Sequence, residues 1–349
     1  MLNSRNPALP FVLFLLVILS GLLDTLRVPR TNAAEATAAA PVNTFPIPET
    51  LVPIFAGGSP KGVADLKAME EHQRQLSDKL TSFTVGVQIG PAWGSGVLVS
   101  KDGYVLTAAH VSGQPNRDVI FVFPDGKTKR GKTLGLNRTL DAGLMKITDK
   151  GEYPFADMAA ANSLKEGQWC VAMGHPGGYF PDRKPVFRLG RVLFHDREAV
   201  TTDCTLVGGD SGGPLFDMEG RVIGINSRIS GELKSNMHVP IAAFREDWEK
   251  MEQGKAWGHF PGQEPFIGVR GEPNVKEAKL LTIVGGSPAD KAGLKVGDVV
   301  LKFSGVDITD FPSLTAQVRE KQPGERIKML IRRGEEQIEL AVIIGKKGS

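Results

Sequence analysis

Short strand-like runs separated by turn residues dominate the chain from residue 84 to residue 226. The first run, residues 85–89, alternates apolar residues with small or polar ones, which is the period of a half-buried strand. Strands are expected at 94–99 and 104–107, with Asp102-Gly103 as the tight turn between them. Because long helices do not separate these runs, antiparallel barrels or sandwiches are favoured. The expected fold class is therefore mainly β.

The parts of the chain on either side have different patterns. Residues 61–80 have apolar residues at helical spacing, and residues 35–60, rich in Ala, Pro and Thr, indicate a linker. Residues 262–347 combine strand-like runs with two helical pieces, which predicts a small α+β domain. We therefore expect a β domain over residues 81–255 and a second domain over 262–347.

The first 34 residues have the composition of a secretory signal peptide. Arg5 precedes an apolar run over residues 11–23, and small residues follow at Asn32-Ala33-Ala34. The alternative is a signal-anchor in which residues 11–23 stay in the membrane. Both interpretations place the rest of the chain outside the cytoplasm, in the periplasm or another extracytoplasmic space.

Charge and cysteine content narrow the function classes. The formal net charge of +3 gives no case for a nucleic-acid partner. The histidines lack metal-ligand spacing, so neither a metal nor a cofactor is expected. Cys170 and Cys204 are too few for a disulfide framework. They either pair in an oxidising compartment or serve as small buried hydrophobic residues.

Three motifs carry the chemistry of a nucleophilic serine. His110 ends the strand-like run Leu-Thr-Ala-Ala-His, Asp141 opens an apolar run, and Ser211 lies in Gly-Gly-Asp-Ser-Gly-Gly-Pro. A serine hydroxyl needs an adjacent imidazole as general base, and a carboxylate to orient that imidazole. Backbone N–H groups of Gly209, Asp210 and Ser211 are the expected donors to an oxyanion.

The order of these residues separates two classes of hydrolase. Gly209, Ser211 and Gly213 also fit the Gly-x-Ser-x-Gly pattern of α/β-hydrolases. Those enzymes run Ser, then Asp or Glu, then His, and a helix follows the serine. Here the order is His, Asp, Ser, and Pro214 follows the serine closely. The chymotrypsin-like arrangement is therefore favoured.

The motifs resemble those of the HtrA (Deg) family of serine proteases. Residues 80–250 look like its protease domain and residues 262–347 like its PDZ domain, so the resemblance covers most of the chain after residue 80. Beside the trio, the matching segments are Gly-Ser-Gly at 94–96, Ala-Met-Gly-His-Pro at 172–176, Thr-Asp at 202–203 and Gly-Ile-Asn-Ser at 224–227. The resemblance implies a chymotrypsin-like double antiparallel β-barrel followed by a small α+β PDZ domain.

The resemblance also implies substrate-binding residues. Thr205 would lie near the base of the side-chain pocket and favour small aliphatic substrate residues. Ile225, Asn226 and Ser227 would pair with extended substrate. In the second domain, the loop Phe266, Ile267, Gly268, Val269 would bind a peptide carboxylate.

Two positions depart from the family pattern. Asp210 stands where the family usually has Asn; in digestive proteases that aspartate pairs with a new N-terminus, and Ile-Val-Gly-Gly at 283–286 lies too late in this chain to supply one. Gly143 stands where the family has a larger apolar residue.

Two functions from different classes remain. The first is an exported serine endopeptidase that cleaves unfolded or misfolded proteins, binds C-terminal peptides at its PDZ domain and, as the resemblance implies, forms a homotrimer. The second is a peptide-binding scaffold or chaperone whose protease domain is inactive or rarely activated.

Overall fold

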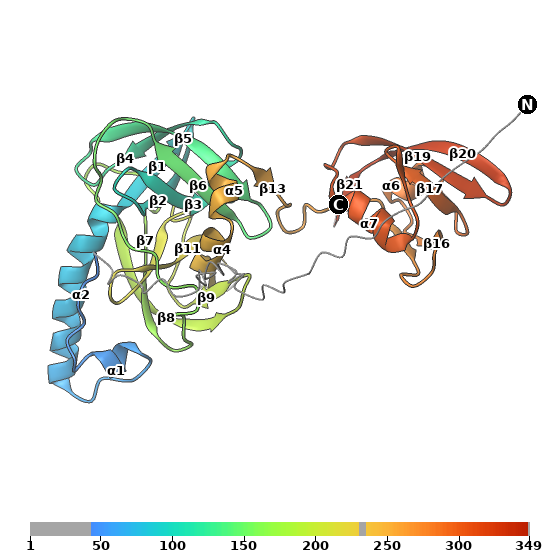
Figure 1. Cartoon of the computed structure of the whole chain (residues 1–349). Helices are drawn as coiled ribbons and strands as arrows, with labels where there is room; N and C mark the ends of the chain where they lie inside the picture. The colour runs from blue at the N-terminus through green and yellow to red at the C-terminus, as the bar shows by residue number, and fades with distance from the viewer. Residues whose placement is uncertain (1–42, 230–234, 348–349) are drawn as a thin grey trace, which may run out of the picture. The chain divides into compact units, whose positions relative to one another are not determined.

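The computed structural model describes residues 43–229 and 235–347. Its strands form two closed antiparallel barrels and, later in the chain, a separate small sheet domain (Figure 1). The expected mainly β fold class is confirmed.

The first barrel contains the predicted hairpin. Its strands are β1 (Thr84–Ile89), β2 (Ala92–Leu98), β3 (Tyr104–Ala108), β4 (Asp118–Val122), β5 (Thr128–Asn137) and β6 (Ala142–Ile147). They follow the order β5-β4-β1-β2-β3-β6, and a further β5–β6 pairing closes the barrel. Val97 lies opposite Leu106 in the predicted β2–β3 hairpin, whose turn contains Gly103 at a φ of 94°. The alternating apolar residues of β1 point into the core of this barrel.

The second barrel precedes two short helices and a strand that returns to the first barrel. Its strands are β7 (Trp169–Gly174), β8 (Val186–His195), β9 (Val200–Thr202), β10 (Pro214–Asp217), β11 (Val222–Ile229) and β12 (Asn236–Pro240), followed by α4 (Ile241–Glu246), α5 (Trp248–Glu252) and β13 (Ala256–Trp257). The closed order is β10-β11-β12-β9-β8-β7. β13 runs parallel to β5, where the Leu136 N–H donates to Lys255 O and the Arg138 N–H to Trp257 O.

The segment before the barrels is packed rather than free. It contains α1 (Val52–Phe55) and the predicted long helix α2 (Val63–Phe83). Leu51, Ile54 and Phe55 are buried in the same core cluster as Leu76 and Leu80 of α2. The interpretation of residues 35–60 as a linker is therefore wrong for residues 43–58, because a few buried apolar residues suffice to pack this Pro-rich segment into the same core as α2. Residues 35–42 lie outside the described residues.

The C-terminal domain has its own core and the predicted small α+β character. Its elements are β14 (Pro265–Phe266), β15 (Val269–Gly271), β16 (Ala278–Ile283), α6 (Pro288–Lys291), β17 (Val299–Phe303), β18 (Val306–Asp307), α7 (Phe311–Arg319), β19 (Arg326–Arg333), β20 (Glu336–Ile343) and β21 (Gly345–Lys346). The main sheet has the order β15-β16-β17-β19-β20. α7 begins at a capping box, in which Asp310 accepts from the Ser313 N–H and Ser313 accepts from the Asp310 N–H.

The predicted signal peptide or anchor and the two cysteines are only partly addressed by the structure. No helix within residues 43–229 and 235–347 has the length and apolar character to span a membrane. The predicted signal peptide at 1–34, with its alternative anchor at 11–23, lies outside those residues.

Cys170 and Cys204 are buried free thiols with their Sγ atoms 3.8 Å apart. The two thiol groups are therefore in contact but do not form a disulfide bond.

The packing of α2 predicts an asymmetric response to truncation. Leu76 is fully buried, whereas Leu66 of the same helix is 53% exposed. Leu76→Ala should lower the free energy of unfolding of the two barrels by about 2–5 kcal/mol, because it removes buried apolar surface and leaves a cavity. Leu66→Ala should change it by less than about 0.5 kcal/mol. Denaturant unfolding followed by tryptophan fluorescence measures both, and equal effects would contradict the packing of α2.

Candidate active site

His110 and Asp141 come together because their strands are neighbours. β3 pairs with β6, placing Ala108 opposite Ala142, and the short helix α3 (Ala109–Ser112) carries His110 directly after β3. His110 Nδ1 lies 2.8 Å from Asp141 Oδ2, and the His110 backbone N–H donates to Asp141 Oδ1 at 2.9 Å. Because a carboxylate only accepts, Nδ1 carries the proton and Nε2 is left to accept one. The predicted base and its orienting carboxylate are therefore assembled.

Asp141 is held by a third donor from the other barrel. The Ser227 hydroxyl of β11 donates to Asp141 Oδ2 at 2.6 Å. Asp141 is 2% exposed and has a φ of 64°, a strained backbone for this residue type. Burial raises the pKa of its carboxyl group, but the hydrogen bonds from His110 and Ser227 outweigh burial, so the pKa lies below its ordinary value. The carboxylate therefore stays charged at neutral pH.

Gly143 permits this arrangement of β3 and β6. A Cβ atom on Gly143 would lie 3.1 Å from Ala108 O and 3.2 Å from Ser112 Oγ. A larger residue on this backbone would crowd the strand and helix that lead to His110. The departure from the family pattern therefore accompanies a close approach of β6 to α3.

The loop before Ser211 is fixed so that two backbone N–H groups are free. Gly208 O accepts from the Gly177 N–H at 2.7 Å, and Asp210 O accepts from the Gly213 N–H at 2.9 Å. The C=O and N–H of a trans peptide point in opposite directions. The N–H groups of Gly209 and Ser211 therefore point away from those donors, and they have no hydrogen-bond acceptor in the part of the chain that the structure describes. This is the arrangement that an oxyanion hole requires.

Asp210 does not contribute a donor, contrary to its predicted role. Its N–H donates to Val207 O at 3.1 Å, because the chain turns tightly between these residues. Its side chain is fully buried, with Oδ2 accepting from the Val207 N–H at 2.9 Å and lying 3.1 Å from Arg188 Nη2 of β8. Burial raises the pKa of the Asp210 carboxyl group above its ordinary value, and Arg188 opposes that shift. The charged partner left unassigned by the sequence is therefore Arg188.

Ser211, His110 and Asp141 line one cleft. Val207, Gly208, Ser227, Arg228 and Ile229 of the second barrel also line it. Within the described residues, Ser211 Oγ and His110 Nε2 form no hydrogen bond, and such bonds are often long before substrate binds. The structure thus brings the three predicted residues to one site with the base already oriented.

Three of the predicted substrate-binding residues lie elsewhere. Thr205 is exposed and does not line the cleft, since its neighbours Cys204 and Leu206 take the buried positions. Ile225 and Asn226 are fully buried, and the N–H and C=O of Asn226 bond to Gly213 and Gly212. The part of β11 that lines the cleft begins at Ser227 and continues through Arg228 and Ile229.

A buried network of hydrogen bonds supports the serine loop, the turn that leads to Ser211. Asn226 Nδ2 donates to Met173 O and Asp210 O, and its Oδ1 accepts from His238 Nδ1 at 3.0 Å. His238 Nε2 accepts from the Thr202 hydroxyl at 2.7 Å. Burial lowers the pKa of His238 to about 3, so the ring is neutral and both of its nitrogens are paired. Sequence reasoning missed His238, because an isolated histidine in a strand gives no signal of its partners.

The predicted carboxylate-binding loop borders the helix α7. Phe266, Ile267, Gly268 and Val269 line a groove with Leu314 and Val318 of that helix. Ile267 O and Gly268 O bond to Ala289 and Val284, while the N–H groups of Ile267 and Gly268 have no acceptor among the described residues. Gly268 has a φ of 84°, and a Cβ there would lie 2.2 Å from Ser287 Cβ. The loop therefore presents two free donors and requires glycine at its centre.

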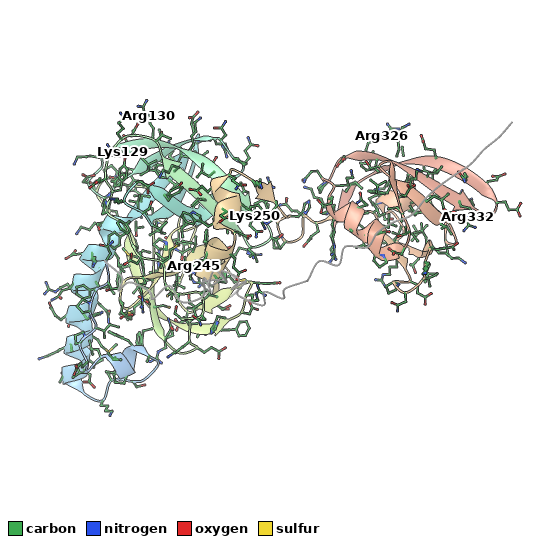
Figure 2. The ribbon with its side chains drawn as sticks, in the orientation of Figure 1. Lys129, Arg130, Arg245, Lys250, Arg326 and Arg332 are labelled. Atoms are coloured by element: carbon green, nitrogen blue, oxygen red, sulfur yellow. The ribbon has the colours of Figure 1, made fainter. Side chains whose placement is uncertain are left out.

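Within the described residues no group of three or more His, Cys, Asp or Glu side chains is placed to hold a metal ion. Lys129 and Arg130 project from β5, whereas Arg245 and Lys250 come from α4 and α5 (Figure 2). These four basic side chains therefore come from β5, α4 and α5 and not from a single element.

Comparison with known proteins decides the family. The trypsin-like peptidase domain matches residues 94–225, and the PDZ domain matches residues 265–344. A Hahella chejuensis protein named "Probable periplasmic serine endoprotease DegP-like" is 33% identical over 278 residues, which cover 75% of this chain and 58% of that protein. The chain belongs to the HtrA family.

Other members of the HtrA family and a solved structure are also similar. A Xenopus tropicalis protein named "Serine protease HTRA1" is 26% identical over 283 residues, 73% of this chain and 60% of that protein. The crystal structure of the serine endoprotease from Yersinia pestis aligns with a TM-score of 0.49 and 24% identity, covering 78% of this chain and 97% of that chain. The chain thus spans 58–60% of the length of the two curated HtrA relatives.

The geometry of the HtrA serine loop predicts a sharp difference between adjacent glycines. Gly209 has a φ of 96°, and a Cβ there would lie 2.4 Å from His175 O; a Cβ on Gly208 would meet nothing within 4 Å. Gly209→Ala should destabilise the protease domain by at least about 1–2 kcal/mol, because an L side chain is strained at this φ. Gly208→Ala should cost less than about 1 kcal/mol.

Thermal unfolding of the two variants and the parent protein measures the difference. Equal unfolding temperatures for the two alanine variants would contradict this conformation of the serine loop.

Proposed function

We propose that the protein is a serine endopeptidase that uses Ser211 as nucleophile, His110 as general base and acid, and Asp141 as the carboxylate that orients His110. The observation that carries this proposal is the pairing of an oriented His110–Asp141 couple with two free N–H donors beside Ser211. Membership of the HtrA family and the matching trypsin-like peptidase domain support it.

The proposed reaction follows from these positions. His110 Nε2 takes the hydroxyl proton as Ser211 Oγ attacks the peptide carbonyl, and the oxygen that becomes negative accepts from the Gly209 and Ser211 N–H groups. Collapse of this intermediate breaks the peptide bond as His110 returns the proton to the leaving amine. Water then hydrolyses the acyl-enzyme by the same route. Asp141 stabilises the imidazolium without taking its proton.

Extended polypeptide is the proposed substrate. Ser227, Arg228 and Ile229 line the cleft on the part of β11 that follows Asn226, and Ile229 is 51% exposed. A peptide in β conformation would add to this strand by main-chain hydrogen bonds. Because folded proteins rarely offer an unpaired strand, unfolded or misfolded proteins are the substrate class that suits this site.

The proposed activity is tested with reduced, unfolded casein. The parent protein should cleave it, and Ser211→Ala should not. Asp141→Asn should lower kcat by about 10⁴-fold, because the amide can donate to His110 Nδ1 and so hold the imidazole in the wrong tautomer. Gel analysis and mass spectrometry of the fragments measure both effects. Equal cleavage by the parent and Ser211→Ala would refute the assignment of the nucleophile, and no cleavage by either would favour the scaffold interpretation.

We further propose that the PDZ domain binds the carboxylate at the end of a polypeptide. The free N–H groups of Ile267 and Gly268 are suitable donors to a carboxylate, and Leu314 and Val318 offer apolar contacts for the last side chain. The peptide would lie against the loop in extended form.

Peptide binding is tested with a pool of labelled peptides that end in apolar residues. Peptides with a free C-terminus should bind, and the same peptides with an amidated C-terminus should bind at least about tenfold more weakly, since a charged hydrogen bond contributes about 1.5–3 kcal/mol. Gly268→Ala should weaken binding of the free peptides as well. Fluorescence polarisation measures affinity, and equal affinity for the two forms would exclude carboxylate recognition.

An extracytoplasmic location and a homotrimeric state complete the proposal. The signal-like residues 1–34 support export, as does the word "periplasmic" in the names of relatives such as the Hahella protein. Trimer formation rests on the family resemblance alone. Cell fractionation tests the location, and light scattering coupled to gel filtration tests the oligomeric state.

A further inference from the structure

We propose that Arg188 is a positioning residue of the active site: its guanidinium group holds the buried Asp210 carboxylate inward and thereby keeps the serine loop in the conformation that presents the oxyanion donors. This inference rests on the proposed function, because it assigns Arg188 a role in forming the same oxyanion hole. Digestive proteases use the charged N-terminus for this purpose. Here the counter-charge comes from the middle of a strand.

The location of Arg188 makes it part of the fold rather than a surface group. It lies on β8 opposite Ala172 of β7, and its side chain is 16% exposed. Nη2 lies 3.1 Å from Asp210 Oδ2. A strand held in a closed barrel keeps the guanidinium group in place before any substrate or partner binds.

Few groups other than Arg188 can stabilise the charge of the Asp210 carboxylate. Its side chain is fully buried, its Oδ2 also accepts from the Val207 N–H, and its Oδ1 has no hydrogen-bond partner in the described part of the chain. A Cβ on Gly174 would lie 2.6 Å from Oδ1, so the strand β7 closes that side. Of the charged groups that act on the carboxylate, Arg188 contacts it and Arg183 adds a weaker attraction. The adjacent His175 is neutral, since burial lowers its pKa to about 4.

Asp210 acts on the oxyanion donors through the backbone, because the Ser211 N–H belongs to the peptide group that follows Asp210 and the Gly209 N–H to the second peptide group before it. The peptide group before Asp210 is fixed by Ser95 Oγ, which donates to Gly209 O at 2.9 Å, and the peptide group after it by the Gly213 N–H. A carboxylate that turned outward to reach water would rotate these peptide groups. The Ser211 N–H would turn with the peptide group after Asp210, and the Gly209 N–H, on the peptide group next to the one before Asp210, would lose its fixed position. An unpaired buried carboxylate is unfavourable enough to drive such a change.

The test compares Arg188→Met, Asp210→Asn and the double variant in the full-length protein. Arg188→Met should lower kcat/KM for casein-derived peptides by roughly 10²-fold, the effect of losing an oxyanion donor. It should also shift the pH profile of kcat/KM so that the loss becomes smaller toward acid pH, because the Asp210 carboxyl group would lose a contact that lowers its pKa and its protonated form needs no counter-charge. The double variant should recover most of the activity and lose this shift, since an amide accepts from Val207 without needing a counter-charge.

Arg191→Met is the matched control. Arg191 lies on the same strand, stacks on Trp169 and donates to Gly57 O and Gly58 O, remote from Asp210. Its substitution should lower the unfolding temperature while leaving kcat/KM and the pH profile within about twofold of the parent. A fall in activity that merely followed lost stability would appear in this variant as well.

The outcomes separate this inference from the proposed activity. Parent-like kcat/KM and pH profile in Arg188→Met would overturn the inference, as would a double variant no more active than the single one. If the parent cleaves nothing, the proposed function fails. The inference is then decided by calorimetric binding of a peptide boronic acid, whose adduct with Ser211 places an oxygen at the Gly209 and Ser211 N–H groups. Binding by the parent but not by Arg188→Met supports it, and any other pattern overturns it.

Discussion

The carboxylate of Asp141 is the group on which the geometry of the site depends. It accepts from the backbone and ring of His110 in the first barrel and from the hydroxyl of Ser227 in the second. The two barrels therefore meet at one buried charge. Any relative shift of the barrels would break at least one of these hydrogen bonds, and in a buried site each carries a large penalty when lost. The same contacts orient the base and join the halves of the protease domain.

Two buried aspartates in this domain have opposite pKa shifts for clear reasons. Asp141 has three donors directed at it, so its pKa is lowered despite burial, whereas Asp210 has one N–H and one guanidinium group and its pKa is raised. The neutral rings of His175 and His238 lie near the serine loop without adding charge. Of these four buried groups, the charged ones are thus those that position His110 and the serine loop. The positive φ of Gly209 then gives the serine loop its backbone conformation.

Sequence reasoning succeeded where the signal was local. Alternating apolar residues identified β1, a turn dipeptide identified the β2–β3 hairpin, and the motifs around His110, Asp141 and Ser211 identified residues that the fold brings to one cleft. It failed where the answer depends on which side of a strand a residue faces. Asn226 looked like a substrate contact because it follows the family motif, but its side chain is directed inward to Met173 and His238.

The partner of Asp210 could not be predicted for a related reason. Arg188 lies in a strand whose other residues give no hint of a buried charge, and only the closure of the second barrel brings it to the serine loop. The packed segment at 43–58 was hidden in a similar way. The composition of residues 35–60 is that of a linker, while the few apolar residues that decide the packing lie among prolines. Which residues pair across a barrel, and which isolated apolar residues become buried, is decided only when the chain folds. Local sequence patterns therefore do not reveal it.

The parallel pairing of β13 with β5 defines where the double-barrel domain can be separated from the C-terminal domain. Residues 255–257 supply the acceptors for the Leu136 and Arg138 N–H groups, on the strand that leads to Asp141. Proteolysis or truncation before residue 256 would expose an unpaired sheet edge a few residues from the Asp141 carboxylate. A cut after Gly258 would leave that edge covered. Exchange of the C-terminal domain, in evolution or by engineering, is therefore least disruptive at a junction beyond Gly258.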